Sequence, residues 1–180
     1  MYIWVAIDVD KQLEIQKEIV KNIEEKIGIK QSNASLLPLH ISLKISAEVP
    51  KHYEAGLRKD ITLLFESTNA FVVEVDRIEL RNTIVWIKMK ESEQLTKLHN
   101  ELCSLYNDKY GIALHEFDMY FMYHSTLFLD SDESKVQEAF EIVKTIELPT
   151  RLTANRFIIG SSPKGKIGTY SVDDIIEHSL

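Results

Sequence analysis

The sequence predicts an α/β (α+β) protein built from two similar lobes. Strand-like and helix-like segments alternate along all 180 residues, the order of segments in the first half is repeated in the second, and a histidine-containing strand occurs once in each half. A chain of this length can bury a sizeable core within one domain. We therefore expect a single domain, residues 1–180, made of two β-α-β-α-β lobes at about 1–81 and 82–180.

The first two elements come from apolar periodicity. Residues 2–9 are almost continuously apolar, which is typical of a strand covered on both faces. Asp10 can cap a helix that ends at Gly28, because glycine readily takes the left-handed backbone that stops a helix. A polar loop, residues 31–35, is expected to follow. The apolar positions that mark the helix are Leu13, Ile19, Val20, Ile23 and Ile27.

Three more elements complete the first half. From Leu39 to Ser46 apolar and polar residues alternate, the pattern of a half-buried strand. Pro50 opens a second helix, and residues 70–80 predict a strand.

The second half repeats this order. Residues 83–89 predict a strand, residues 92–109 a helix that stops at Gly111, and residues 119–129 the second histidine strand. Asp130 with Glu133 resembles a capping pair for a fourth helix. Two last strands are expected at about residues 150–160 and 167–174, joined by a hairpin connection at residues 161–166.

The two halves align at a nearly constant shift. Trp4 meets Trp86 at a shift of 82, Gly28 meets Gly111 at 83, and His40 meets His124 at 84. This period is too long for a solenoid repeat. The economical interpretation is two lobes related by a pseudo-twofold axis, with the two histidine strands opposite each other across a cleft.

Composition excludes several classes of protein. No apolar run approaches the roughly 20 residues that span a bilayer, and the N-terminus lacks the pattern of a signal peptide, so we expect a cytoplasmic protein without a membrane partner. The single cysteine, Cys103, excludes an internal disulfide and a multi-thiolate zinc site, and it is expected to pack beside a helix. A net charge of −7 argues against an extended nucleic-acid surface. We expect a monomer.

Two short motifs carry the functional signal. On the first strand His40, Ser42 and Lys44 share one face, because side chains alternate along a strand. On the second strand His124 and Thr126 share a face in the same way. One histidine on a strand is more often structural than functional. Two segments of the form His-x-(Ser/Thr)-apolar at equivalent places in a repeat favour a shared site.

The paired motifs suit phosphodiester chemistry. Such a reaction needs a base for the attacking oxygen and an acid for the leaving oxygen on the opposite side. Histidine can serve as either near neutral pH, since its ordinary pKa is about 6.5. Ser42 and Thr126 can donate hydrogen bonds to the non-bridging phosphate oxygens. This chemistry requires neither a metal ion nor a cofactor.

The motifs His40-Ile41-Ser42-Leu43 and His124-Ser125-Thr126-Leu127 resemble those of the two-histidine (2H) phosphoesterase superfamily, in its 2′-5′ RNA ligase-like and cyclic phosphodiesterase branch. The resemblance extends over nearly the whole chain. It implies a bilobal fold with two mainly antiparallel sheets flanking a central cleft and helices outside. It also implies activity on 2′,3′-cyclic phosphates, other cyclic nucleotide phosphates or 2′-5′ linkages, with small nucleotides or RNA ends as substrates and His40, Ser42, His124 and Thr126 as the catalytic set.

Further candidates for substrate contact are less specific. Lys44 shares the face of His40, and Tyr123 precedes His124. Residues 160–166 match the G-x-x-x-x-G-K spacing of a phosphate loop, but Ile167 stands where that loop has Ser or Thr, which favours the hairpin. Lys164 and Lys166 on this connection can still reach over the cleft.

Two rival functions remain open at this point. The fold could serve a nucleotide- or RNA-binding protein without significant turnover. A metal-dependent hydrolase is a more distant alternative, because the paired histidines have no nearby carboxylates, and His115-Glu116-Phe117-Asp118 has no matching partner for a metal site. The remaining histidines, His52, His99, His115 and His178, are expected at the surface or on helices.

Overall fold

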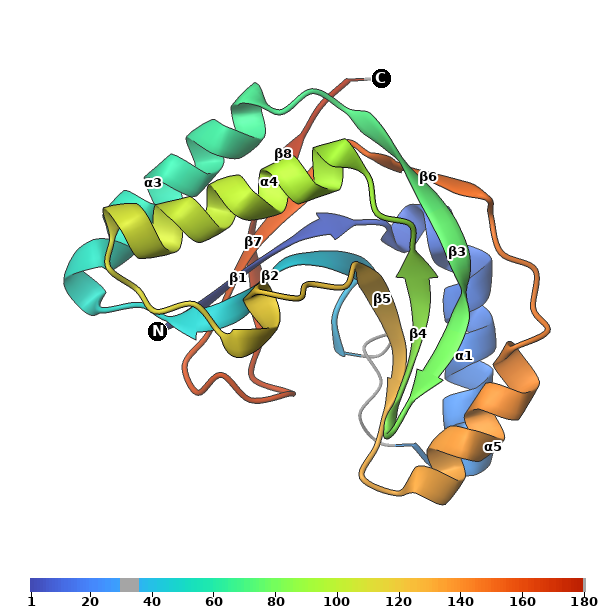
Figure 1. The fold of residues 1–180 in the computed structure, drawn as a ribbon. Coiled ribbons are helices and arrows are strands. Elements are labelled where there is room, and N and C mark those ends of the chain that lie inside the picture. The colour runs from blue at the N-terminus through green and yellow to red at the C-terminus, as the bar shows by residue number, and fades with distance from the viewer. Residues whose placement is uncertain (30–35, 180) are drawn as a thin grey trace.

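The computed structural model describes residues 1–29 and 36–179, and within these residues it contains two four-stranded antiparallel sheets with helices outside them (Figure 1). This arrangement confirms the expected fold class. The polar loop expected at residues 31–35 lies outside the described residues. In the part of the chain that is described, no helix has both the length and the apolar character needed to cross a membrane.

The elements follow the predicted order with adjusted bounds. The strands are β1 (Tyr2–Asp8), β2 (His40–Glu48), β3 (Phe71–Arg81), β4 (Ile84–Met89), β5 (His124–Leu129), β6 (Arg151–Ala154), β7 (Arg156–Ser162) and β8 (Ser171–Glu177). The helices are α1 (Glu14–Ile27), α3 (Lys51–Ser67), α4 (Glu93–Ser104) and α5 (Glu133–Val143). Three short turns are η1 (Asp10–Leu13), η2 (Leu105–Lys109) and η3 (Glu116–Asp118), of which η2 is a π-helical turn.

The sheets do not follow the two halves of the chain. The first sheet has the order β2-β1-β7-β8 and the second β5-β4-β3-β6, so the first half contributes β3 to the second sheet and the second half contributes β7 and β8 to the first. The chain passes from one sheet to the other at Asn155, between β6 and β7. This crossing divides the strand expected at residues 150–160 in two. The division into lobes at about residues 1–81 and 82–180 stays a prediction from the repeat, and the sheets cross it.

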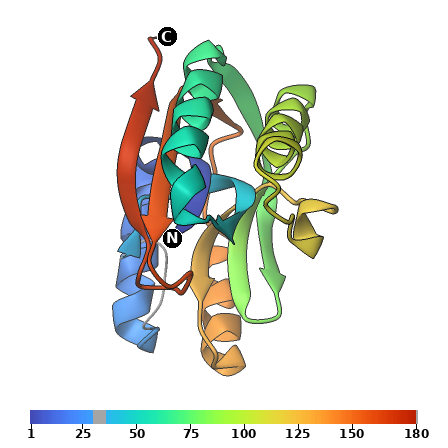
Figure 2. The same cartoon turned by 90° about the vertical axis from the view of Figure 1, so that its left-hand side faces the viewer.

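The helices interlock the halves in the same way. α3 and α4 pack on the first sheet, against β7, β8 and β2, whereas α1 and α5 pack on the second, against β3, β4 and β5. Figure 2 shows the first sheet with β8 in red at its outer edge, and α3 beside it. Each sheet is thus covered by one helix from each half. A single buried cluster runs through both lobes, and the strand residues Ile3, Ile7, Leu43, Val85 and Leu127 belong to it.

Four local expectations are corrected. The fourth helix is capped by Asp132, whose carboxylate accepts from the backbone N–H groups of Ser134 and Lys135, and not by Asp130. Asp10 does not cap α1. Its carboxylate accepts from the backbone N–H of Leu39 and from Lys17, because η1 separates it from the helix.

The other two corrections concern the second half. The third helix changes to a π-helical turn at η2 before it stops at Gly111, whose φ of 64° is left-handed. The second histidine strand begins at His124 instead of residue 119. Residues 115–121 leave the sheet because η3 is held by the side chain of Asp118, which caps it through the backbone N–H of His115.

Within the first sheet, Trp4 on β1 and Gly160 on β7 approach each other closely. A Cβ atom placed on Gly160 of β7 would lie 2.1 Å from Nε1 of Trp4 and 2.3 Å from the carbonyl oxygen of Ser171. The indole of Trp4 therefore lies directly on the backbone of Gly160, where its N–H donates to that same carbonyl oxygen at 3.1 Å. Only glycine leaves room for this contact.

We predict that Gly160→Ala lowers the free energy of unfolding by about 1–3 kcal/mol or more, the usual cost of overpacking a core. The control is Gly56→Ala on α3, where the new Cβ meets the movable end of the Tyr110 side chain at 2.9 Å, and a change below about 1 kcal/mol is expected. Urea unfolding measures both. If both substitutions change the free energy of unfolding by equal, small amounts, the close contact between Trp4 and Gly160 does not contribute to stability.

Candidate active site

The two histidine strands are adjoining edges of the two sheets. β2 and β5 each pair with one neighbour in their own sheet, and they also contact each other, as their places at the centre of Figure 1 show. The pseudo-twofold arrangement therefore brings His40 and His124 to one place. Both side chains line the same cavity.

The imidazole of His40 is held by two contacts. Its Nδ1–H donates to the carbonyl oxygen of Pro38 at 2.8 Å, since a carbonyl can only accept. Its ring lies 4.9 Å from the indole of Trp4, on the neighbouring strand β1, with 52° between the planes. The side chain is 8% exposed.

His124 repeats both contacts. Its Nδ1–H donates to the carbonyl oxygen of Met122 at 2.7 Å, and its ring lies 4.0 Å from the indole of Trp86 on β4. In each histidine the carbonyl two residues earlier selects the tautomer that carries its proton on Nδ1. Each neutral ring consequently keeps the lone pair of Nε2 free for a proton.

The hydroxyl residues follow the histidines on the same strands. Ser42 pairs with Ala6 across β1 and lines the cavity. Thr126 pairs with Trp86 across β4 and is half-buried. Residues paired across antiparallel strands share a face of the sheet. Thr126 is thus on the face where Trp86 contacts His124.

The cavity has a volume of about 270 Å³ and a mixed wall. Its polar residues are His40, Ser42, Lys44, Ser46, His124 and Tyr170, and the hydroxyl groups of Ser46 and Tyr170 lie 2.8 Å apart. Its remaining residues are Trp4, Leu36, Leu37, Ile45, Phe121, Ile167 and Gly168. The strand β2 thus supplies most of the polar groups of the cavity, and Trp4, Leu36, Leu37 and Ile167 supply an apolar part of its wall.

Burial changes the titration of both histidines. Desolvation lowers the pKa of His40 below its ordinary value, against the opposing effects of the Pro38 carbonyl and the carboxylates of Asp8 and Asp10. Desolvation also lowers the pKa of His124, with a further contribution from the charge of His40, while the Met122 carbonyl acts in the opposite direction. The neutral form of each ring is thus favoured at pH 7 in the free protein.

Lys44 lines the cavity with His40 and Ser42, but its ammonium group is bound by other residues of the protein. Its ammonium group is buried, donates to the carboxylate of Asp118 and to the carbonyl oxygen of Ile45, both at 3.0 Å, and lies 4.5 Å above the ring of Tyr106. The pairing of β1 with β2 shifts register after Ser42, so the alternation of faces does not continue regularly to Lys44. A contact between this ammonium group and a substrate is not supported by the geometry.

The other residues that were predicted to contact the substrate fall into two groups. Tyr123 is buried in the core, where desolvation raises the pKa of its phenol to about 12, and it does not line the cavity. Lys164 and Lys166 are exposed, on the segment whose residues Ile167 and Gly168 do line it. Among the described residues neither lysine forms a salt bridge. These two remain candidates for an anionic substrate.

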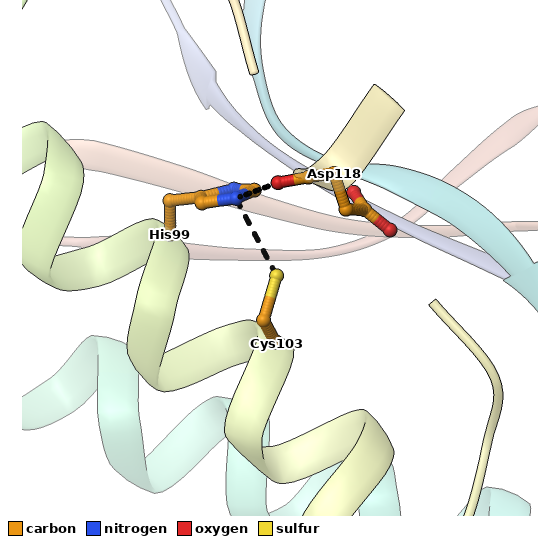
Figure 3. A group of neighbouring side chains, drawn as sticks. All are labelled: His99, Cys103 and Asp118. Carbon is orange, nitrogen blue, oxygen red and sulfur yellow. Dashed lines mark hydrogen bonds between the residues drawn. The ribbon is translucent and has the colours of Figure 1, made fainter. Parts of the chain in front are cut away.

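A second cluster of potential ligands lies behind the cavity. Figure 3 shows His99, Cys103 and Asp118, whose donor atoms lie within 4.8 Å of one another. Nδ1 of His99 lies 2.8 Å from the carbonyl oxygen of Leu43, and Nε2 lies 3.0 Å from that of Asp118. Both ring nitrogens are thus engaged. His99 lies on a helix, α4, as expected for it, and it is buried.

The remaining two groups also suit a metal ion poorly. The carboxylate of Asp118 points away from the other two side chains in Figure 3 and accepts from Lys44 and from the backbone N–H groups of Ile45 and His115. Burial raises the pKa of the Cys103 thiol to about 11, so the thiolate that metals prefer is disfavoured. The cluster fits a polar network that ties η3 to β2 and α4.

Sequence reasoning missed four residues around the histidines. The repeat aligned Trp4 with Trp86, which was a signal for the indoles that pack on both imidazoles. Lys88 lies opposite His124 on β4, and the alternation of residues 84–89 places it on the face of Trp86. The guanidinium of Arg81 lies 6.0 Å from the Trp86 ring. The sequence around Arg81 does not indicate this contact, because it depends on the side chain extending along the sheet from β3 to the Trp86 ring.

Comparison with known proteins supports the family resemblance that the two histidine motifs indicate. The profile of the 2′-5′ RNA ligase superfamily matches residues 12–165. A comparison with curated protein sequences finds no significant match. Among solved structures, E. coli LigT matches 99% of this chain and 98% of its own with 19% identity and a TM-score of 0.63. TT0787 of Thermus thermophilus matches 98% and 97% with 16% identity and a TM-score of 0.64. These two likenesses concern the fold.

The lowered pKa values predict a pH dependence of stability. As the pH falls through about 6.5, the unfolded chain binds protons at these histidines before the folded protein does, so the free energy of unfolding decreases. The stabilising contribution is present above pH 6.5 and is lost toward the lower folded pKa.

Urea unfolding between pH 5.5 and 7.5 should show a steeper decline for the native sequence than for the double variant His40→Gln/His124→Gln. The difference in slope is at most about 1.4 kcal/mol per pH unit for each histidine. Identical slopes would mean that the two rings are not desolvated.

Proposed function

The chain belongs to the 2′-5′ RNA ligase superfamily, and on that premise we propose that it is a metal-independent phosphoesterase in which His40 and His124 are general acid and base. The substrates would be cyclic nucleotide phosphates or 2′-5′ phosphodiester linkages of small nucleotides or RNA ends. The observation that supports this most directly is that both histidines are held in the same tautomer. Each histidine uses Nδ1 for a carbonyl and leaves Nε2 free, and both line one cavity.

Hydrolysis of a 2′,3′-cyclic phosphate illustrates the proposed roles. A neutral imidazole takes a proton from water through Nε2 while the water oxygen bonds to phosphorus. The second imidazole, as imidazolium, gives its Nε2 proton to the ribose oxygen while the phosphorus–oxygen bond to that oxygen breaks. The product is a phosphomonoester, and proton exchange with solvent restores the starting pair.

The free protein favours two neutral rings, whereas the mechanism needs one proton on the pair. The negative charge of a bound phosphodiester favours the imidazolium form of a histidine beside it. The proton therefore enters the site with the substrate. Ser42 and Thr126 would donate to the non-bridging oxygens, and Lys164 and Lys166 would add positive charge from the segment over the cavity.

The substrate class is consistent with the cavity. E. coli LigT has been crystallised in complex with 3′-AMP and with NADP⁺. In this chain the apolar part of the cavity wall, with Trp4, Leu37 and Ile167, would receive the base of a nucleotide whose phosphate lies between the histidines. We further propose that the protein acts as a cytoplasmic monomer.

We predict that His40→Ala and His124→Ala each lower kcat/KM by about 10²–10⁴-fold, the usual contribution of a positioned acid or base. Ser42→Ala and Thr126→Val should cost less, since each removes one donor while others remain. The control is His52→Ala on α3, which is exposed and outside the cavity. Chromatography of reactions with 2′,3′-cyclic nucleotides and 2′-5′ dinucleotides measures the rates, and chelators should leave them unchanged.

Two outcomes would contradict the proposal. Near-full activity in either alanine variant would exclude the acid–base assignment. Loss of activity with EDTA and rescue by zinc or manganese would indicate a metal-dependent hydrolase. Tight nucleotide binding without turnover of any of these compounds would favour a binding protein of the same fold.

A further inference from the structure

The two sheets present different surfaces to the cleft. On the first sheet β8 pairs along β7 from Arg156 to Ser161, and the segment before β8 closes the cavity with Ile167, Gly168 and Tyr170. On the second sheet β6 pairs with β3 only over residues 71–74. Residues 77–81 of β3 therefore have no strand on their outer side among the described residues. The pseudo-symmetric equivalent of the closed cavity is open there.

The open surface carries a basic residue at a position where the first sheet has a small apolar one. Arg77 on β3 lies opposite Lys88 on β4, which lies opposite His124 on β5. At the equivalent of Lys88, a shift of 82, the first sheet has the buried residue Ala6. The side chains of Arg77 and Arg81 are 55% and 50% exposed; both pair with Glu79, and Arg77 also pairs with Asp76. One row of basic groups thus extends from His124 across the second sheet.

A run of exposed apolar residues precedes His124 in the chain and reaches the same surface at Met122. Phe117, Met119 and Tyr120 are 61%, 70% and 84% exposed, and Met122 is 37% exposed. Other large apolar residues exposed on the described surface are scattered along the chain. Phe121 lines the cavity, and the sulfur of Met122 lies 4.0 Å from Nη2 of Arg81. The segment therefore connects the cavity to the basic row.

This segment is held in place from behind. The buried carboxylate of Asp118 accepts from Lys44 and from the backbone of Ile45 on β2, and His99 contacts the carbonyl oxygen of Asp118. The ring of Phe121 stacks on that of His99 at 4.4 Å. Because the backbone of the segment is already anchored, a base that stacks on Tyr120 has only the side chain of that residue to order.

We propose that Arg77, Arg81, Lys88, Tyr120 and Met122, here named the β3–β4 ledge, bind the nucleotide adjoining the one whose base enters the cavity, so that the substrate is the end of an RNA strand. This inference rests on the proposed function. The cavity is below the roughly 300–1,000 Å³ of pockets for drug-sized ligands, which suits one nucleoside and leaves the strand outside. Bases stack on aromatic side chains, and guanidinium groups bind phosphates.

The test compares kcat/KM for uridine 2′,3′-cyclic phosphate with that for a trinucleotide ending in the same group. The native protein should prefer the trinucleotide. In Arg81→Gln the ratio of trinucleotide to mononucleotide should fall by about 10-fold or more, and in Tyr120→Ala by about 5-fold or more. Matched controls are Arg151→Gln, an exposed arginine on β6, and Tyr53→Ala, an exposed tyrosine on α3. Both should keep the native ratio.

A binding measurement separates this inference from the proposed function. Fluorescence anisotropy of a 5′-labelled oligoribonucleotide with a 3′-phosphate reports binding without turnover, and Arg81→Gln should weaken it. If neither compound is turned over but binding still depends on Arg81, the phosphoesterase proposal is wrong and the β3–β4 ledge is supported. Turnover with ratios unchanged in both ledge variants would overturn the ledge. A dimer in sedimentation that Tyr120→Ala dissociates would also overturn it, since the surface would then join two copies.

Discussion

The arrangement of the site depends on the interlocking of the two halves of the chain. Neither half completes a sheet from its own strands, because β3 joins the second sheet and β7 the first. Each sheet is also covered in part by a helix of the other half, since α1 packs on β5 and α4 on β2. Burial of apolar surface therefore drives both halves to fold together. This mutual burial brings the edge strands β2 and β5, with their histidines, against each other.

The two histidines are held by the same kinds of contact, once in each sheet. A carbonyl two residues before each histidine selects its tautomer, and an indole from the next strand supports its ring. The supports differ in detail. Trp4 lies on the backbone of Gly160 and donates to Ser171, while the indole N–H of Trp86 has no acceptor in the described part of the chain. The fold therefore duplicates the proposed chemistry and leaves the two flanking surfaces free to diverge.

Local periodicity predicted the elements, the repeat and the pairing of the two motifs. It could not reveal the exchange of strands at Asn155, because pairing partners leave no mark on the period of a strand. It placed Lys44 with His40 and Ser42 at the cavity, where the structure has it, but it could not show that the buried carboxylate of Asp118 binds the ammonium group, because the two residues lie far apart in the sequence. It extended the second histidine strand back to residue 119, where apolar residues in fact lie exposed beside η3. The roles of Trp86 and Arg81 depend on contacts between strands, which a single sequence does not show.

The central claim is that Nε2 of His40 and Nε2 of His124 face one phosphate group. A crystal structure with a bound nucleoside 3′-phosphate tests it most directly. We expect phosphate oxygens to lie about 2.6–3.2 Å from Nε2 of both rings, Nδ1 of each ring to keep its bond to the carbonyl of Pro38 or Met122, and the base to lie against Trp4. A phosphate that contacts neither Nε2, or rings that turn to present Nδ1, would contradict it.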